Sequence, residues 1–325
     1  MVRFLPSKSC WLGVMAAACG GRVAPLGGEG DAGPDRYCGD GVVGTGEECD
    51  DGVNDGRRGG CDSDCARVPG WAMVSAGGLN TCVLDAVGEA VCWGLNDYRQ
   101  SEPSSHQFAS LSAGGYHGCG LRTDGSASCW GWNEEGQASP PQANLVSISA
   151  GGHHTCGVRT DGTAVCWGSD AGGQSTAPPD GFASVSAGYY HSCGVRLDGT
   201  VVCWGSGDSG QVTEPEGSFA SVSAGGEHNC GVRADGTVAC WGSDEGGETG
   251  PPSGTFTSVS AGFWHTCGVR TDGTVACWGV IRRTDLPAGT FRAISAGFGH
   301  ACGLRTDGSV ACWGQDGFGQ ATPPF

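Results

Sequence analysis

The stretch of sequence that decides the fold runs from Phe182 to Gly205 and reads FASVSAGYYHSCGVRLDGTVVCWG. Small and β-branched residues alternate along it, Asp198-Gly199 supplies a turn, and no window has helical periodicity. The stretch therefore predicts a small antiparallel sheet in which a tight hairpin joins two of the strands.

The same unit occurs seven times from residue 71 onward. Its second cysteine falls at residues 92, 129, 166, 203, 240, 277 and 312, so the spacing is 37 residues five times and then 35. One such sheet cannot bury both faces, but sheets stacked radially cover one another, and closing the ring removes exposed edges. Phe325 is in phase with Trp71, so we expect the ends to meet at one seam. The alternative, an open solenoid, would need capping units.

Several short motifs recur in most units. In the fourth unit they are Gly188, His191, Asp198-Gly199 and Trp204-Gly205, and a Gly-Gln pair such as Gly319-Gln320 ends most units. Over residues 71 to 325 this pattern resembles the regulator of chromosome condensation repeat family. The resemblance implies an all-β fold, a seven-bladed β-propeller. The family includes secreted bacterial propellers that inhibit enzymes by binding them, and a eukaryotic nucleotide exchange factor that works on chromatin.

Composition limits the possible functions. The 325 residues include 63 Gly and 15 Pro, and 34 acidic residues against 17 basic ones give a net charge of -17. Such a chain is repelled by phosphate backbones, so we expect no nucleic-acid partner. No Gly-x-Ser-x-Gly elbow, phosphate-binding Gly-Lys loop or His-Glu-x-x-His helix is present in the sequence. We therefore expect a binding protein rather than an enzyme. A hydrolase or lyase directed at polysaccharide or cell wall, with a site around Glu227-His228 or His153-His154, is the alternative, and nucleotide exchange is a third.

The amino terminus indicates export. Residues 1–18 resemble a signal peptide, with Arg3 and Lys8 before an apolar stretch that ends in Ala16, Ala17 and Ala18. Small residues directly before Cys19 resemble the cleavage box of bacterial lipoproteins, which predicts lipid attachment at Cys19. Plain secretion and a cytoplasmic chain are the alternatives. We expect an extracytoplasmic protein, either secreted or a lipoprotein of the cell envelope, that is a monomer and contacts membranes only through its lipid.

We expect a flexible tether over residues 19–36 and a Cys-rich module over residues 37–66 before a propeller of residues 67–325. The module contains Cys38, Cys49, Cys61 and Cys65 and resembles a small module of exported bacterial proteins with CGDG and CDDG-type sequences. We expect two disulfides there, although a zinc site is the rival. Its carboxylates offer ligands for calcium, but a solvated turn is the simpler interpretation, so no cofactor is predicted.

The cysteines of the repeats predict one disulfide in each unit. With Thr160-Asp161-Gly162 as the hairpin, Arg159 pairs with Thr163, and counting outward places Cys156 opposite Cys166 at a non-hydrogen-bonded position. The predicted pairs are Cys82–Cys92, Cys119–Cys129, Cys156–Cys166, Cys193–Cys203, Cys230–Cys240, Cys267–Cys277 and Cys302–Cys312. Fourteen packed thiols are the alternative.

Other recurring residues are best explained by the architecture. Six units share a His at one position, where the first unit has Asn80. Because Asn satisfies buried polar groups but binds metals poorly, we expect structural hydrogen bonds there rather than a ring of metal ligands. The repeated Trp residues predict packing between blades. Arg and Asp of the hairpin, as in Arg196 and Asp198, are both lost in the first unit, which suggests that they interact.

Function is therefore expected where the units differ. The two residues before the recurring His share one phase and should gather at one rim of the ring, where aromatic side chains are typical anchors for proteins. Carbohydrate stacking and simple packing between blades are the alternatives. A second variable site is the loop of the sixth unit, where two adjacent arginines either anchor an acidic partner or are solvated. The predicted partner-binding residues are Tyr116, His153, Tyr189, Tyr190, Phe263, Trp264, Phe298, Arg282 and Arg283.

Overall fold

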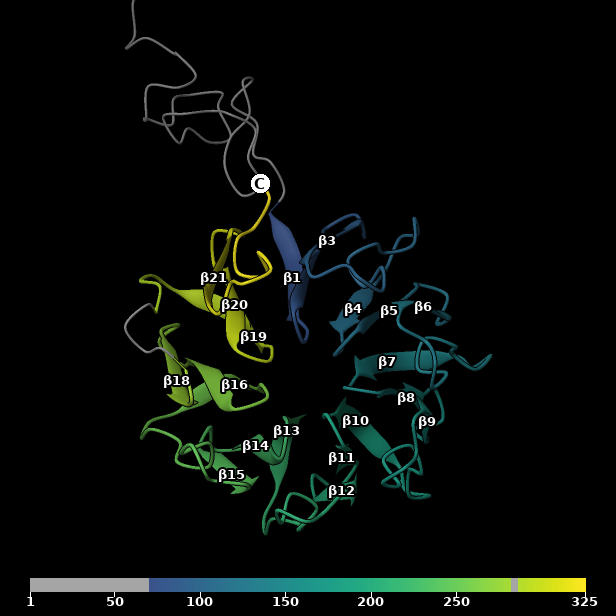
Figure 1. The fold of residues 1–325 in the computed structure, drawn as a ribbon. Helices are drawn as coiled ribbons and strands as arrows, with labels where there is room; N and C mark the ends of the chain where they lie inside the picture. Colours follow the sequence, from purple (N-terminus) through teal and green to yellow (C-terminus); the bar gives the residue numbers. More distant parts are fainter. Residues whose placement is uncertain (1–69, 282–285) are drawn as a thin grey trace, which may run out of the picture. The chain divides into compact units, whose positions relative to one another are not determined.

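Seven three-stranded antiparallel sheets form the part of the chain that the structure describes, residues 70–281 and 286–325 of a computed structural model. The sheets follow one another around a ring, and each contains three consecutive strands in sequence order (Figure 1). The described residues include no helix that is long and apolar enough to cross a membrane. The fold is the predicted seven-bladed β-propeller.

Each unit contributes its three strands in the same order. The first strands are β1 (Trp71–Ala76), β4 (Ser110–Ala113), β7 (Leu145–Ala150), β10 (Phe182–Ala187), β13 (Phe219–Ala224), β16 (Phe256–Ala261) and β19 (Phe291–Ala296). The second strands are β2 (Asn80–Asp85), β5 (His117–Leu121), β8 (His154–Arg159), β11 (His191–Arg196), β14 (His228–Arg233), β17 (His265–Arg270) and β20 (His300–Arg305). The third strands are β3 (Ala90–Gly94), β6 (Ala127–Gly131), β9 (Ala164–Gly168), β12 (Val201–Gly205), β15 (Val238–Gly242), β18 (Val275–Gly279) and β21 (Val310–Gly314).

The hairpin between the second and third strands has the predicted register. In the third unit, Arg159 N donates to Thr163 O at 2.8 Å, Gly162 has a φ of 85°, and Cys156 lies opposite Cys166. Only Gly adopts this left-handed conformation without a steric penalty. All seven predicted pairs are disulfides, with Cα–Cα distances of 4.0–4.1 Å. The predicted signal peptide, Cys19, the tether and the Cys-rich module lie outside the described residues.

The hydrophobic core lies between neighbouring blades rather than within one. Cys156 and Val158 of the third unit pack against Phe182, Val202 and Trp204 of the fourth. Each blade therefore covers a face of the next, as stacking of the sheets predicts. The recurring Trp is part of this packing, since Trp204 belongs to the same cluster as Cys156 and Val158 of the preceding blade.

The ring closes between the seventh unit and the first, as expected. Trp71 N donates to Gly308 O at 2.9 Å. The ring of Phe325 packs 4.7 Å from that of Trp71 and 5.6 Å from that of Trp93. Trp93 Nε1 also donates to Gln320 O at 3.0 Å. The seam is held by the same kinds of contact as the other blade junctions.

The recurring histidines connect neighbouring blades. His117 Nε2 lies 2.7 Å from Thr155 Oγ1 of the next unit, and Thr155 Oγ1 donates its only proton to Gln137 O at 3.0 Å. His117 Nε2 must therefore carry the hydrogen of this contact. Five of the six histidines have such a partner in the next blade. The described residues contain no group of three or more His, Cys, Asp or Glu that could hold a metal ion.

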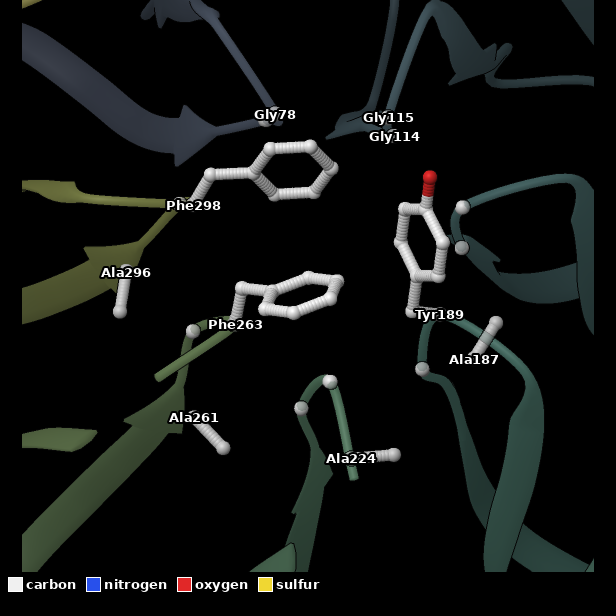
Figure 2. A pocket seen from close by; sticks show the side chains of 18 of the residues that line it. Gly78, Gly114, Gly115, Ala187, Tyr189, Ala224, Ala261, Phe263, Ala296 and Phe298 are labelled. Atoms are coloured by element: carbon white, nitrogen blue, oxygen red, sulfur yellow. The ribbon is translucent and has the colours of Figure 1, made fainter. Parts of the chain in front are cut away.

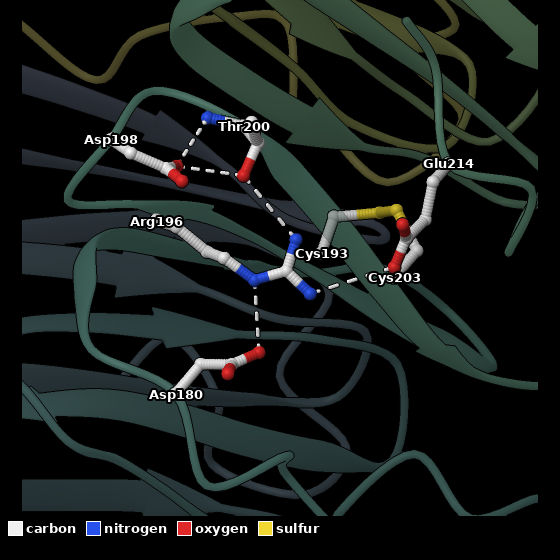
Figure 3. A network of polar contacts seen from close by, with 7 residues as sticks. All are labelled: Asp180, Cys193, Arg196, Asp198, Thr200, Cys203 and Glu214. Carbon is white, nitrogen blue, oxygen red and sulfur yellow. Dashed lines mark hydrogen bonds and ion pairs between the residues drawn. A yellow bond between two sulfur atoms is a disulfide. The ribbon is translucent and has the colours of Figure 1, made fainter.

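The hairpin arginines do not pair directly with the hairpin aspartates. In the fourth unit, Arg196 Nε donates to Asp180 Oδ2 at 2.9 Å, and its NH1 donates to Thr200 Oγ1, which in turn donates to Asp198 Oδ1 at 2.7 Å (Figure 3). In the third and fourth units, Arg and Asp thus interact through a threonine. In the fifth to seventh units, the arginine NH1 donates instead to a backbone carbonyl. In the first unit, Asp85 and Val87 stand in place of the hairpin Arg and Asp. There Asp85 Oδ1 accepts from Val87 N and Glu89 N, so this one carboxylate caps the hairpin.

Candidate functional site

The first strands of all seven blades end around a small central pocket. Its lining is the Ala, Gly and first variable residue of each unit, and its volume is about 80 Å³. Three of the variable residues are aromatic, namely Tyr189, Phe263 and Phe298, and their rings gather over the pocket, facing Gly78 and Gly115 (Figure 2). The aromatic rings and the glycines therefore occupy equivalent backbone positions in different blades.

A ring of backbone hydrogen bonds holds these positions together. Gly115 N donates to Gly151 O at 2.9 Å, Tyr189 N donates to Gly225 O at 3.0 Å, and equivalent bonds join all seven units. The bonds bring neighbouring blades so close that a Cβ atom at Gly152 would lie 2.6 Å from Tyr189 Cδ2. Glycine next to an aromatic residue makes room for its ring.

The central rings belong to a larger continuous cluster, which we call the aromatic rim. Tyr189 lies 4.9 Å from Phe263 and 5.4 Å from Phe298 between ring centroids, and Phe263 lies 4.4 Å from Trp264. His153 contacts Tyr189 at 5.0 Å. These separations and the inclined ring planes are typical of favourable aromatic pairs. The aromatic rim consists of Tyr98, Tyr116, Trp132, His153, Tyr189, Tyr190, Phe263, Trp264 and Phe298.

The structure brings together all seven aromatic and histidine residues that the sequence singled out. It adds two that sequence reasoning missed, Tyr98 and Trp132, from loops that follow the Trp-Gly motif. Trp132 N donates to Tyr116 O at 2.9 Å, and the same bond recurs in the other units. The first residue after Trp-Gly is therefore a third variable position beside the aromatic rim. Aligning the seven repeats would have shown that this position varies. Arg282 and Arg283 lie outside the described residues.

The aromatic rim is partly open to solvent. Trp264 is 48% exposed, Tyr98 49% and Tyr190 41%, while Tyr189 is partly buried. Burial, followed by the neighbouring Tyr190 and Tyr116, raises the pKa of Tyr189 to about 12, so its hydroxyl stays protonated. Burial also lowers the pKa of His153, and the charge of Glu135 partly opposes this. The surface is thus apolar and aromatic, with hydroxyl groups that can donate hydrogen bonds.

Two of the four side chains considered for catalysis, His154 and His228, lie inside the blade junctions. His154 and His228 are almost fully buried, and their Nε2 atoms bond Ser192 Oγ at 2.7 Å and Thr266 Oγ1 at 2.8 Å. Burial lowers the pKa of His154 to about 3 and that of His228 to about 4. Both rings therefore stay neutral and inside the blade junctions, while Glu227 is exposed.

The junction of the sixth and seventh units departs from the pattern. Ala301 stands where most units carry the hydroxyl or amide that binds the preceding His. Accordingly, His265 Nε2 has no side-chain partner in the next blade among the described residues. Trp313 Nε1 is also buried without a hydrogen-bond partner there, and the sixth unit lacks the Gln or Glu whose carbonyl accepts from the equivalent Trp in the other units. A cavity of about 590 Å³ lies nearby, lined by residues such as Ile281 and Gln315.

The comparison of the repeats with known families agrees with this architecture. The profile of the regulator of chromosome condensation (RCC1) repeat matches residues 108–137, 145–174, 182–211, 219–248, 256–280 and 291–320, more than half of the chain. The chain belongs to the RCC1 repeat family. Among curated protein sequences, no significant match to the chain was found.

Among solved structures, this RCC1-repeat protein is similar to plant receptor ectodomains. It is 29% identical to the ectodomain of the receptor kinase CR4 from Physcomitrella patens, covering 76% of this chain and 74% of that one, with a TM-score of 0.66. It is 28% identical to the CRINKLY ectodomain of the Arabidopsis thaliana receptor kinase ACR4, covering 78% of this chain and 100% of that one, with a TM-score of 0.65. Prp20p from Saccharomyces cerevisiae, at 16% identity, covers 70% of this chain and 80% of its own, with a TM-score of 0.62, and shares the fold.

Proposed function

We propose that this RCC1-repeat propeller is a protein-binding module of the extracellular or periplasmic space, and that its aromatic rim is the binding surface. The proposal rests on one observation: the rings of the aromatic rim come from several different units and form a continuous surface at positions that vary between units. The fold does not require these rings, because glycine or other small residues stand at the equivalent positions in other units. Large aromatic residues at partly exposed positions are typical anchors of protein interfaces.

The dimensions of the site favour a surface contact over a buried substrate. The central pocket of about 80 Å³ is smaller than usual ligand pockets, which measure about 300–1,000 Å³. Trp264, Tyr190 and Tyr98 instead present their exposed area on the outside of the rim. A partner that lies across the rim can bury these three side chains at once.

The disulfides support a location outside the cytoplasm. Seven disulfides in one domain are typical of proteins that mature in an oxidising compartment. The similar plant proteins are themselves ectodomains of receptor kinases. We extend the proposal to attachment through a lipid on Cys19, because small residues precede that cysteine. Radiolabelled palmitate incorporated into the wild type but not into a Cys19→Ala variant tests this attachment.

Affinity capture from intact cell envelopes tests the binding function. The bait is the full chain, compared with a double variant, Trp264→Ala with Tyr190→Ala, and with Leu197→Ala, which removes an apolar side chain that is 74% exposed at a hairpin. We expect a stoichiometric protein partner that the double variant loses and the Leu197 variant retains. All three should show equal circular dichroism and thermal unfolding.

Three results would contradict the proposal. One is capture that is the same with the double variant as with the wild type. Another is retention by a glycan array that depends on Trp264 and Tyr190 while no protein is retained, which would favour a carbohydrate-binding protein. The third is turnover of a cell-wall polysaccharide by the purified chain, which would favour a hydrolase or lyase.

A further inference from the structure

Charge around the aromatic rim limits which partners it can accept. We propose that the aromatic rim binds a basic protein segment, whose Lys or Arg side chains lie over its exposed rings. This inference rests on the proposed function, since it specifies the chemistry of the partner at the same surface.

Exposed carboxylates surround the rim. The loops that follow the Trp-Gly motif begin on the same side as the rim, because the first residue of each loop donates its N–H to the carbonyl of the residue before the recurring His or Asn. Each loop later reaches the hairpin end, where Asp180 and Glu214 lie beside Arg196. In every unit whose loop is fully described, the start of this loop carries at least one exposed acidic side chain. Examples from six units are Asp97, Glu135, Asp170, Asp208, Asp244 and Asp316.

Two of the rim-side carboxylates can be placed relative to the rings. The charge of Glu135 acts on the ring of His153, a member of the rim. Glu227 takes, in the fifth unit, the position that Tyr190 and Trp264 take in the fourth and sixth. Its Oε2 accepts from Ser209 Oγ at 3.0 Å, which fixes the carboxylate on this side. The aromatic surface is therefore bordered by negative charge.

Among the described residues, positive charge other than Arg99 lies at the other end of the same strands, while Arg282 and Arg283 of the sixth unit's loop lie outside those residues. The second strand of the fourth unit begins at His191 beside the rim and ends at Arg196 beside the hairpin, five residues or about 16 Å away. Arg196 pairs with Asp180 at 2.9 Å, and Arg233 stacks on a phenylalanine ring at 4.8 Å. Among the described residues, Arg99 is the one arginine in the rim-side loops.

This distribution favours a cationic partner for two reasons. The face of an exposed Trp or Tyr stabilises a bound guanidinium or ammonium group, and carboxylates near that ring stabilise the same cation further. An acidic segment or a nucleic acid meets repulsion from the same carboxylates. The rim thus combines an apolar contact area with a charge that selects one class of partner.

Fluorescence anisotropy with two defined probes tests the inference. The probes are a short labelled peptide of alternating Lys and Ser and the same peptide with every lysine acetylated. We expect the lysine peptide to bind the full chain at least about tenfold more tightly than the acetylated one, and to weaken as salt rises. The Trp264→Ala and Tyr190→Ala double variant should lose this binding.

Charge variants assign the binding to the rim. Glu227→Gln and Glu135→Gln should each weaken the lysine peptide about two- to fivefold. Glu214→Gln is the matched control, because this exposed carboxylate lies 3.6 Å from Arg196 at the hairpin end, and it should leave the affinity unchanged. Equal binding of both peptides, or binding of neither, would overturn the basic partner. The proposed function would survive either result if protein capture still required Trp264 and Tyr190.

Discussion

Acidification should destabilise the propeller through its six buried histidines. Burial lowers the pKa of His117 and His154 to about 3, and the pKa values of the other four to about 4. In the unfolded chain a histidine titrates near pH 6.5. Between these values the unfolded state binds more protons, so the histidine contribution is complete above about pH 6.5 and falls as the pH drops towards 4.

The structure gives the physical reason and the size of the effect. His117 Nε2 carries the hydrogen of its bond to Thr155, and Nδ1 has no hydrogen-bond partner among the described residues. A second proton on the ring would therefore be buried without an acceptor. At about 1.4 kcal/mol per pH unit, a change from about pH 7 to about pH 5 costs roughly 2 kcal/mol per ring. Six rings together amount to roughly 12 kcal/mol, within the whole stability of an ordinary domain, about 5–15 kcal/mol.

Urea unfolding with the disulfides intact, measured at several pH values in this range, checks the prediction. The slope of the unfolding free energy against pH counts the protons taken up on unfolding, and it should approach six near the acidic end. His154→Asn, which copies Asn80 of the first unit, should lower the count by one. A flat profile above about pH 5 would refute the reasoning. The hairpin carboxylates contribute to this slope only at lower pH, because hydrogen bonds, as from Thr200 to Asp198, lower their folded pKa values and they take up protons on unfolding only near and below the unfolded Asp pKa of about 4.

Three substitutions test the contacts that hold the blades. Thr155→Val keeps the shape but leaves His117 Nε2 buried without a partner, so it should lower the unfolding free energy by about 1–3 kcal/mol in urea titrations. Cys193→Ala with Cys203→Ala opens a loop with a sequence separation of 10 residues and should cost about 2–3 kcal/mol, measured the same way under non-reducing conditions. Gly194→Ala places a methyl group against the ring of Phe182 and should cost about 1–3 kcal/mol, visible as a lower melting temperature.

Each substitution has a control and a contrary result. Gly317→Ala adds a methyl group where no atom lies within 4 Å, so it should change the stability by less than about 0.5 kcal/mol. Equal melting of the Gly194 and Gly317 variants would show that the close packing is not required. For Thr155, unchanged stability would mean that the contact between blades contributes nothing. For the cysteine pair, an unfolding free energy equal to that of the oxidised wild type would show that this disulfide contributes nothing.

The hairpin register could be predicted from local rules, whereas the complete aromatic surface could not. Asp161-Gly162 fixes the turn, and the turn fixes which cysteines face each other. The periodic alignment also placed Tyr190 and Trp264 in one phase. It did not show that Trp132 and Tyr98 lie beside Tyr116, because those contacts depend on how loops fold back over the strand ends. The link between Arg196 and Asp198 through Thr200 likewise required the side-chain geometry.

The repeat by itself determined the number of blades, the hairpins, the disulfide pairs and the order of the strands, because these follow from interactions between residues close in the chain. Only the tertiary structure decided which side chains meet across blades: the hydroxyl or amide that binds five of the six histidines, and the nine rings that form one surface. Those partners are tens of residues or more apart, and closing the ring brings them within a few ångströms. The residues at repeated positions accordingly stabilise the blades. The residues at variable positions form one surface only because the seven blades close into a ring.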